Sequence, residues 1–245
     1  MSLRLSKETR NAKHRSTRRR PILESLEGRI QLSTFRVNTT LDTVAVNFKN
    51  GKDSAGQISL RSAIMAADTH KGSNTIIVPA GTFTLTIPGA NEDASATGDL
   101  DVKGKVTIKG AGSGSTTVNG NSLDRVFEVL SGNVTIQKLT IVGGLASEGA
   151  GLLNLGGKVA LSAVVVAGNT AQGSAGTFGA QGSGGSNLGG AGGPGGAGFI
   201  GEGGGILNAA GSMTITNSLI SSNVAIGGNG GNRSEERRVG KECLE

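Results

Sequence analysis

Short apolar alternations punctuated by glycine and asparagine recur along the chain from Asn74 onward. Units of the type Val-x-Ile begin at Val106, Val134, Val159 and Met213, at intervals of 28, 25 and 54 residues. The 54-residue interval also relates three other pairs, namely Glu148 with Glu202, Asn154 with Asn208 and Asn169 with Asn223. An internal period of this length, with few helix signals inside it, indicates a repeated unit of about three short strands.

Such a repeat predicts an all-β fold in which parallel strands stack into a β-helix. Each coil would bury inward Val, Ile and Leu side chains against the next coil, with strands ~4.8 Å apart. The corners need residues that accept positive φ, and the chain has 43 Gly in 245 residues. Small aliphatic side chains suit a narrow cylinder, which agrees with the absence of Trp and Tyr. The repeated asparagines are candidates for stacked side-chain ladders.

Residues 35–73 have a different pattern, which predicts an N-terminal capping module. Residues 35–40 alternate as a strand does, and residues 59–68 read as a short helix capped by Ser59. Leu60, Ala63, Ile64 and Ala67 fall on one face of that helix. We expect this apolar face to cover the first coil.

These two segments resemble a known module. Phe35-Arg-Val-Asn-Thr-Thr followed by Ile58-Ser-Leu-Arg-Ser-Ala-Ile64 is similar to the CSLREA-type module, with Ile58 in place of its Cys and Ser62 in place of its Glu. The repeated Gly-x-Leu/Ile-Leu-Asn phrase extends the resemblance over residues 35–232. The resemblance implies a right-handed parallel β-helix of the pectin-lyase-like fold, with coils over residues 74–232.

The positive net charge of +6 belongs to a leader, which we place at residues 1–34. Residues 1–20 hold eight Lys or Arg against Glu8, whereas residues 37–232 hold ten basic and eleven acidic side chains. A solvated, disordered leader is the simplest interpretation, and binding of nucleic acid or anionic lipid is the alternative. No apolar stretch is long enough to predict a transmembrane segment.

The segment from Pro21 to Ser33 resembles the LEPR-XLL-type element of large planctomycete exoproteins, departing from it at Gly28 and Gln31. The resemblance implies export to the cell surface or the medium. The alternative is a short amphipathic helix, since Ile22, Leu23, Leu26 and Ile30 have helical spacing.

Residues 172–205 contain 17 Gly in 34 positions. Such a stretch has too few apolar side chains to form a core of its own. The glycines keep no strict period of three, which argues against collagen, and the stretch has no Asp to ligate calcium as glycine-rich nonapeptides do. We predict a loop inserted at one corner, with a variable contact surface as the alternative function.

The last residues, 233–245, change abruptly to a charged composition and resemble the translation of a common sequencing adapter. We therefore exclude them from fold reasoning as an artefact. Cys243, the single cysteine, would then be foreign, and the gene is expected to continue past Asn232. No disulfide or thiolate metal site is predicted.

No group of residues in the sequence has the composition and spacing of a catalytic or metal-binding site. Asp99 and Asp101 alternate onto one strand face and could bind Ca²⁺, but exposed strand carboxylates are the simpler interpretation. His14 and His70 lie in the leader and in a loop, so spacing supports no nucleophile–base pair. The remaining acids of the coils are Asp124, Glu128, Glu148 and Glu202, the last two at equivalent repeat positions. We therefore assign no catalytic, cofactor-binding or metal residue.

The sequence thus predicts a non-enzymatic, secreted or cell-surface β-helix with a structural or adhesin-like function. Its expected partner is an extracellular or cell-surface polysaccharide or protein, without a cofactor and without specific nucleic-acid binding. The alternative is a polysaccharide lyase or glycoside hydrolase whose active site lies in a missing C-terminal part. An uncovered last coil should also aggregate or fray.

Overall fold

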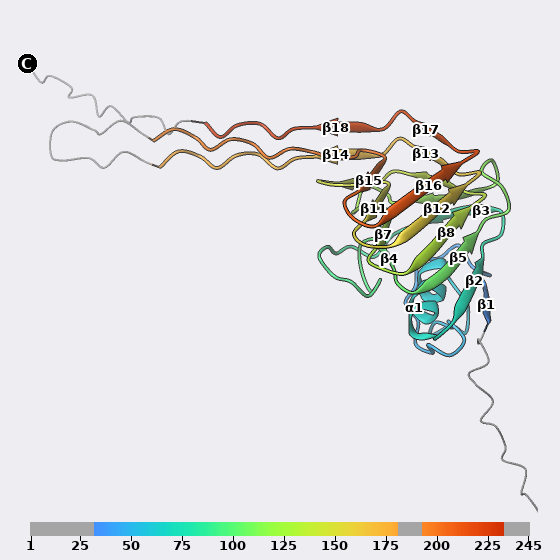
Figure 1. Cartoon of the computed structure of the whole chain (residues 1–245). Coiled ribbons are helices and arrows are strands. Elements are labelled where there is room, and N and C mark those ends of the chain that lie inside the picture. Colours follow the sequence, from blue (N-terminus) through green and yellow to red (C-terminus); the bar gives the residue numbers. More distant parts are fainter. Residues whose placement is uncertain (1–31, 181–192, 233–245) are drawn as a thin grey trace, which may run out of the picture.

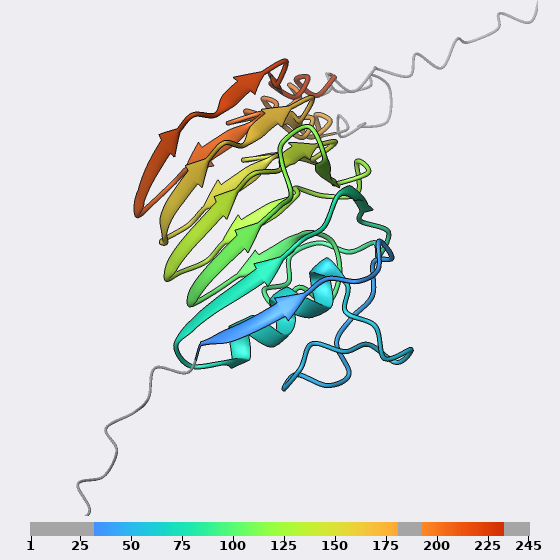
Figure 2. The same cartoon turned by 90° about the vertical axis from the view of Figure 1, so that its right-hand side faces the viewer.

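A computed structural model describes residues 32–180 and 193–232. These residues are mostly short strands in four parallel sheets, with a single helix, so the all-β prediction is confirmed. The predictions for the leader, for the LEPR-XLL-like element and for residues 233–245 fall almost wholly outside the described residues. Figures 1 and 2 show the strands lying in rows, one above another, from the N-terminal to the C-terminal end of the body.

The four sheets differ in the number of strands. The largest contains β1 (Ser33–Arg36), β2 (Ser73–Ile77), β5 (Lys105–Lys109), β8 (Asn133–Gln137), β12 (Lys158–Ser162) and β16 (Ser212–Thr216). The second contains β3 (Gly81–Thr84), β6 (Thr116–Asn119), β9 (Thr140–Val142), β13 (Val165–Ala167) and β17 (Leu219–Ser221). The third contains β4 (Leu100–Val102), β7 (Phe127–Val129), β11 (Leu152–Asn154) and β15 (Ile206–Asn208). The smallest contains β10 (Leu145–Ala146), β14 (Thr170–Gln172) and β18 (Val224–Ile226).

The register of the largest sheet reproduces the sequence repeat. Val106 lies opposite Val134, Val134 opposite Val159, and Val159 opposite Met213. From β2 onward, consecutive strands belong to different sheets: β7, β8, β9 and β10 lie in four different sheets before β11 returns to the sheet of β7. The predicted spacing of the Val-x-Ile units is therefore the spacing of neighbouring strands.

The core consists of the aliphatic side chains that these strands direct inward, because alternate residues of a strand face opposite sides. Ile108, Ile136 and Leu161 form one buried row across the largest sheet. Both predicted asparagine ladders are present: Asn154 Nδ2 donates to Asn208 Oδ1 at 2.6 Å and Asn169 Nδ2 donates to Asn223 Oδ1 at 2.9 Å. Their amides satisfy buried backbone groups that would otherwise lack partners.

The helix α1 (Leu60–Thr69) lies at the N-terminal end of the body, as the sequence predicts (Figure 2). Ser59 caps it, since the Ser59 hydroxyl accepts from the Ser62 amide and the Ser62 hydroxyl accepts from the Ser59 amide. The apolar face is buried and packs against β1, β2 and β4. The helix therefore covers the first strands of the core.

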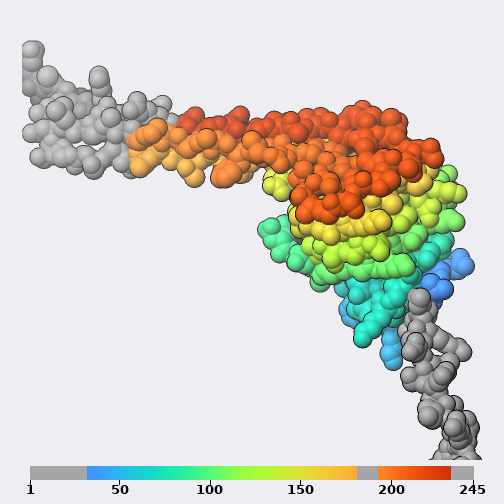
Figure 3. Space-filling view, viewed as in Figure 1, coloured from blue at the N-terminus to red at the C-terminus, as the bar shows by residue number. Residues whose placement is uncertain are grey.

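The glycine-rich stretch follows β14 and projects from the body, and its described parts form regular backbone hydrogen bonds. Residues 173–180 and 193–201 run extended beside residues 226–232 and form a long arm, shown in Figures 1 and 3. The amides of Gly173, Gly176 and Gly179 donate to the carbonyls of residues 226, 229 and 232. Residues 193, 196 and 199 donate to residues 180, 177 and 174, and residues 228 and 231 donate to residues 199 and 196. Each of the three runs therefore donates backbone hydrogen bonds to a different one of the other two runs, at intervals of three residues.

Glycine is needed in the arm because the three runs touch through their backbones. A Cβ atom at Gly179 would lie 1.8 Å from the Gly193 carbonyl oxygen, and one at Gly231 would lie 1.8 Å from the Thr177 oxygen. Close backbone packing at every third residue is the arrangement that requires glycine in collagen-like chains. The whole stretch lacks a strict period of three, but the individual runs keep one, with Gly173, Gly176 and Gly179 in the first run.

The last strands present apolar side chains to solvent. Ile215, Leu219 and Ile220 are 42%, 57% and 47% exposed, and no described strand stacks on the outer side of β16 or β17. Equivalent positions on earlier strands, such as Leu161 and Val166, are buried. The expected uncovered apolar end is therefore present, and its consequence for aggregation remains a prediction.

Candidate functional site: a buried carboxylate cluster

The most unusual group of side chains lies where β4 pairs with β7. Asp101 is directly opposite Glu128, between the pairs Leu100 with Phe127 and Val102 with Val129. Those four apolar neighbours are fully buried in the core. Because side chains alternate along a strand, the two carboxylates point to the outer face of the sheet.

These acids are not exposed, which corrects the simpler sequence-based interpretation of Asp99 and Asp101. Asp99 is 3% exposed, Asp101 is 0% exposed and Glu128 is 7% exposed. Their cover is the loop between β3 and β4, which projects beside β4 in Figure 1. The Ser95 amide donates to Asp101 Oδ2 at 2.8 Å, and the Asp101 amide donates to Ser95 Oγ at 2.7 Å. The loop thus lies over the outer face of the strand and removes the acids from water.

The covering loop is held by Arg61 of α1, which is fully buried. Its guanidinium donates to the carbonyls of Ser95, Gly98 and Asp99 at 2.7–3.1 Å. The same guanidinium pairs with Asp42 at 2.6 Å, and the side chain of Asp42 is only 2% exposed. Arg61 lies in the stretch that resembles the CSLREA module. No sequence pattern predicted that Arg61 would bind the carbonyls of the covering loop, which lie 34–38 residues further along the chain.

Asp99, Asp101 and Glu128 meet at one point. One carboxylate oxygen of each lies within 4.8 Å of the other two. Arg125 approaches from the side, with Nε 2.7 Å from Asp99 Oδ2 and 3.4 Å from Glu128 Oε2. The Arg125 N–H is not directed at the Asp99 oxygen, so this contact is an ion pair without an aligned hydrogen bond. Asp101 Oδ1 has no hydrogen-bond partner.

Burial favours the protonated form of each acid in the cluster. Burial raises the pKa of Asp99 to about 8, and the charge of Asp101 acts in the same direction. Burial raises the pKa of Asp101 to about 7, against the Ser95 hydrogen bond, which lowers it. Burial also raises the pKa of Glu128, with Arg125 opposing the rise. Desolvation therefore outweighs the single positive charge nearby.

The arrangement can compensate its charge in two ways. The carboxyls can hold protons, as their raised pKa values imply. Alternatively a divalent cation can replace the protons, because three ionised carboxylates beside Arg125 leave two uncompensated negative charges. Calcium binds oxygen ligands at about 2.3–2.6 Å, so one ion can contact oxygens that lie within 4.8 Å of one another. Asp99, Asp101 and Glu128 are the residues that could hold such an ion.

The sequence singled out Asp99 and Asp101 but did not connect them with Glu128 or Arg125. Glu128 lies one repeat after Asp101, so the 27-residue offset between the two acids was the available signal.

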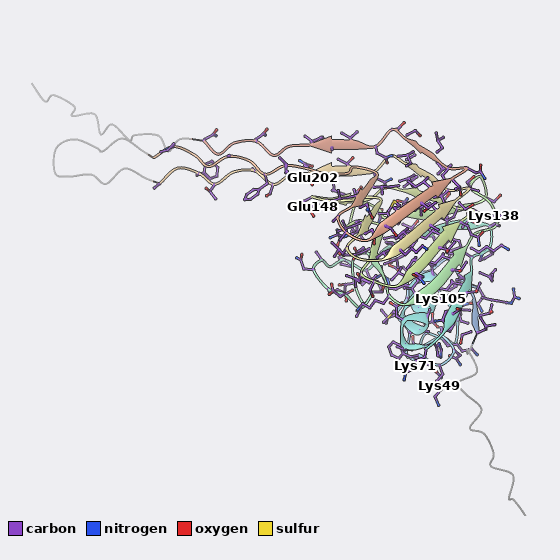
Figure 4. The ribbon with its side chains drawn as sticks, viewed as in Figure 1. Lys49, Lys71, Lys105, Lys138, Glu148 and Glu202 are labelled. Atoms are coloured by element: carbon purple, nitrogen blue, oxygen red, sulfur yellow. The ribbon has the colours of Figure 1, made fainter. Side chains whose placement is uncertain are left out.

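The other acids and His70 lie outside the cluster. Glu148 and Glu202 are exposed and form an isolated parallel β-bridge with each other, one above the other in Figure 4, as expected for equivalent repeat positions. The ring of His70 stacks on Phe35 with centroids 5.4 Å apart.

Within residues 32–180 and 193–232, a helix with the length and apolarity needed to span a bilayer is not found. Comparison with known proteins finds no matching family model, no matching curated protein and no matching solved structure.

Proposed function

We propose that this chain is a right-handed parallel β-helix of the CSLREA type that serves as a secreted or cell-surface scaffold with a structural or adhesin-like function. The observation that carries the proposal is the stacking of six strands in continuous parallel register, from β1 to β16. Stacked short strands with a dry aliphatic core form a stiff rod whose length grows with the number of repeats. A rod of this kind suits presentation of contact surfaces outside the cell.

The order in which the chain visits the sheets supports the β-helix. Each repeat contributes one strand to each of three or four sheets, with glycine or asparagine at many of the intervening corners. Parallel strands need crossover connections, and right-handed crossovers are by far the commoner hand. The α1 helix serves as the cap that the CSLREA resemblance implies, because it covers the first strands.

The same proposal makes the carboxylate cluster a structural feature. A carbohydrate-cleaving enzyme needs acids that touch the sugar. Asp101 is 0% and Glu128 is 7% exposed beneath the loop that contains Ser95. A cluster sealed in this way fixes the loop to the sheet and does not offer its acids to a polymer in solution.

Two measurements test the proposed function. Antibody detection in fractions of the source cells should find the protein in the medium or at the surface, and detection only in the cytoplasm would overturn the proposal. The purified chain incubated with polygalacturonate should release no unsaturated uronate and no reducing ends. Release of either product would instead support the alternative of a polysaccharide lyase or glycoside hydrolase.

A further inference from the structure

A second feature lies at the corner that precedes the strands of the largest sheet. Five glycines occupy equivalent positions there, directly before β2, β5, β8, β12 and β16, namely Gly72, Gly104, Gly132, Gly157 and Gly211. Glycine is required at this corner, since Gly104 and Gly132 have φ of 78° and 86°. A Cβ atom at Gly132 would also lie 1.9 Å from the Gly104 oxygen. The corner is therefore a row of bare backbone.

Three glycines of this row, Gly72, Gly104 and Gly132, form the floor of a groove of about 620 Å³. Side chains that flank the floor include His70, Lys71, Ser73, Lys105 and Asn133. The lining contains no acidic residue. The groove therefore combines positive charge with neutral hydrogen-bonding groups along a surface that lacks obstructing side chains.

The positive charges follow the stacking direction. Ser73, Lys105, Asn133, Lys158 and Ser212 are opposite one another in register. Lys105 and Lys158 are two strands apart, so their backbones are separated by ~10 Å. Lys71 stands beside the same row one strand earlier, and Figure 4 shows Lys71 below Lys105, with Lys138 towards the other edge of the sheet. The row is thus a linear array of cations along the rod.

These lysines are available for a ligand. Lys71, Lys105 and Lys158 are exposed, and none of them takes part in the ion pairs found among the described residues. Lys103, which also flanks the corner, is already engaged, because its ammonium donates to the Asp93 carbonyl. Unpaired lysines that follow the stacking direction create a positive potential that attracts a linear polyanion.

We infer that an acidic polysaccharide binds along this row of glycines, with its carboxylates contacting Lys71 and Lys105 in the groove and Lys158 two strands beyond Lys105. The groove lining contains no arginine fork for phosphate and no Phe, Tyr or Trp on which bases could stack, which disfavours nucleic acid. Ser73 and Asn133 supply neutral partners for sugar hydroxyls. The choice of a polysaccharide rests on the proposed extracellular function, whereas the cationic groove itself does not.

The test is binding of the full chain to polygalacturonate, measured by calorimetry at two salt concentrations. The wild type should bind, and more weakly at higher salt because the contacts are exposed. The variant Lys71→Gln/Lys105→Gln/Lys158→Gln should bind about tenfold more weakly or worse. The control Lys49→Gln/Lys109→Gln/Lys138→Gln removes the same charge elsewhere and should bind within about twofold of the wild type. The basic leader is identical in all three proteins, so the difference between the two variants reports the lysines of the folded body.

Several outcomes would overturn the inference. The wild type could fail to bind polygalacturonate, or both variants could lose the same affinity. The variant Lys71→Gln/Lys105→Gln/Lys158→Gln could also keep the affinity of the wild type. Tighter binding of single-stranded DNA than of polygalacturonate through the same lysines would replace the polysaccharide with nucleic acid.

Acetylation mapped by mass spectrometry gives a second measurement, in which polygalacturonate should protect Lys71, Lys105 and Lys158 but not Lys109. Cell fractionation tests the proposed function separately, so the two failures are distinguishable.

Discussion

Replacing Asp101 with Asn should stabilise the protein at pH 8 and leave its stability near pH 4 almost unchanged. The Asp101 carboxyl has its pKa raised from 3.8 to about 7 by burial. Between these values the folded state holds a proton that the unfolded state releases, so the free energy of unfolding falls as pH rises. The fall is about 1.4 kcal/mol per pH unit for this group, or about 4 kcal/mol in total above pH 7.

Asparagine keeps the local hydrogen bonds while removing the charge. Its Oδ1 can accept from the Ser95 amide as Asp101 Oδ2 does, and its Nδ2 can occupy the position of the partnerless Asp101 Oδ1. That Nδ2 would donate towards the neighbouring carboxylates of Asp99 and Glu128. The variant therefore should not introduce a cavity or an unsatisfied acceptor.

Urea unfolding followed by circular dichroism at pH 4, 6 and 8 provides the measurement. The wild type should lose stability from pH 4 to pH 8, and Asp101→Asn should lose about 4 kcal/mol less. Asp68, whose pKa burial raises to about 7, contributes to both proteins and cancels in the difference. A variant that is no more stable than the wild type at pH 8, or a wild type whose stability rises over this interval, would refute the reasoning.

Calcium distinguishes the two ways in which the cluster can compensate its charge. If the carboxylates bind the ion, Ca²⁺ at a hundred times its dissociation constant stabilises the wild type at pH 8 by about 2.7 kcal/mol. Asp101→Asn should respond less, and a chelator should reverse the effect. An unchanged wild-type unfolding curve at millimolar Ca²⁺ would leave protons as the compensating charge.

Four further predictions concern the rest of the molecule. Gly231→Ala, whose Cβ would lie 1.8 Å from a backbone oxygen, should increase amide exchange in the arm at least about tenfold, whereas Gly230→Ala, with 3.7 Å of clearance, should not. Arg61→Ala should cost about 3–5 kcal/mol in urea unfolding, because it leaves Asp42 buried and unpaired. Asn154→Ala should cost about 2–3 kcal/mol in the same assay, since it breaks buried hydrogen bonds at 2.6–3.0 Å. Leu219→Ser should reduce self-association in light scattering, because Leu219 is 57% exposed at the uncovered end of the body.

The repeat, the strands and the capping helix could be predicted from the sequence because each depends on local chemistry. Alternation at Val106, Val134 and Val159 specifies the buried face of each strand, and the common spacing aligns these residues in one sheet. The cap at Ser59 is likewise local, since its partner Ser62 is three residues away. Asn154 and Asn169 could be recognised as ladder positions because each recurs at the same offset as its strand.

The tertiary structure alone decided which acids are buried and how the glycine-rich arm is built. The sequence predicts Asp99 and Asp101 as exposed strand carboxylates, because no local pattern indicates that the loop containing Ser95 folds over them. That cover depends on Arg61, whose hydrogen bonds reach residues 34–38 positions away. The arm similarly needs residues 226–232 as its third run, about 50 residues beyond the first. Contacts of such long sequence separation leave no periodicity, and periodicity is the signal that predicts secondary structure.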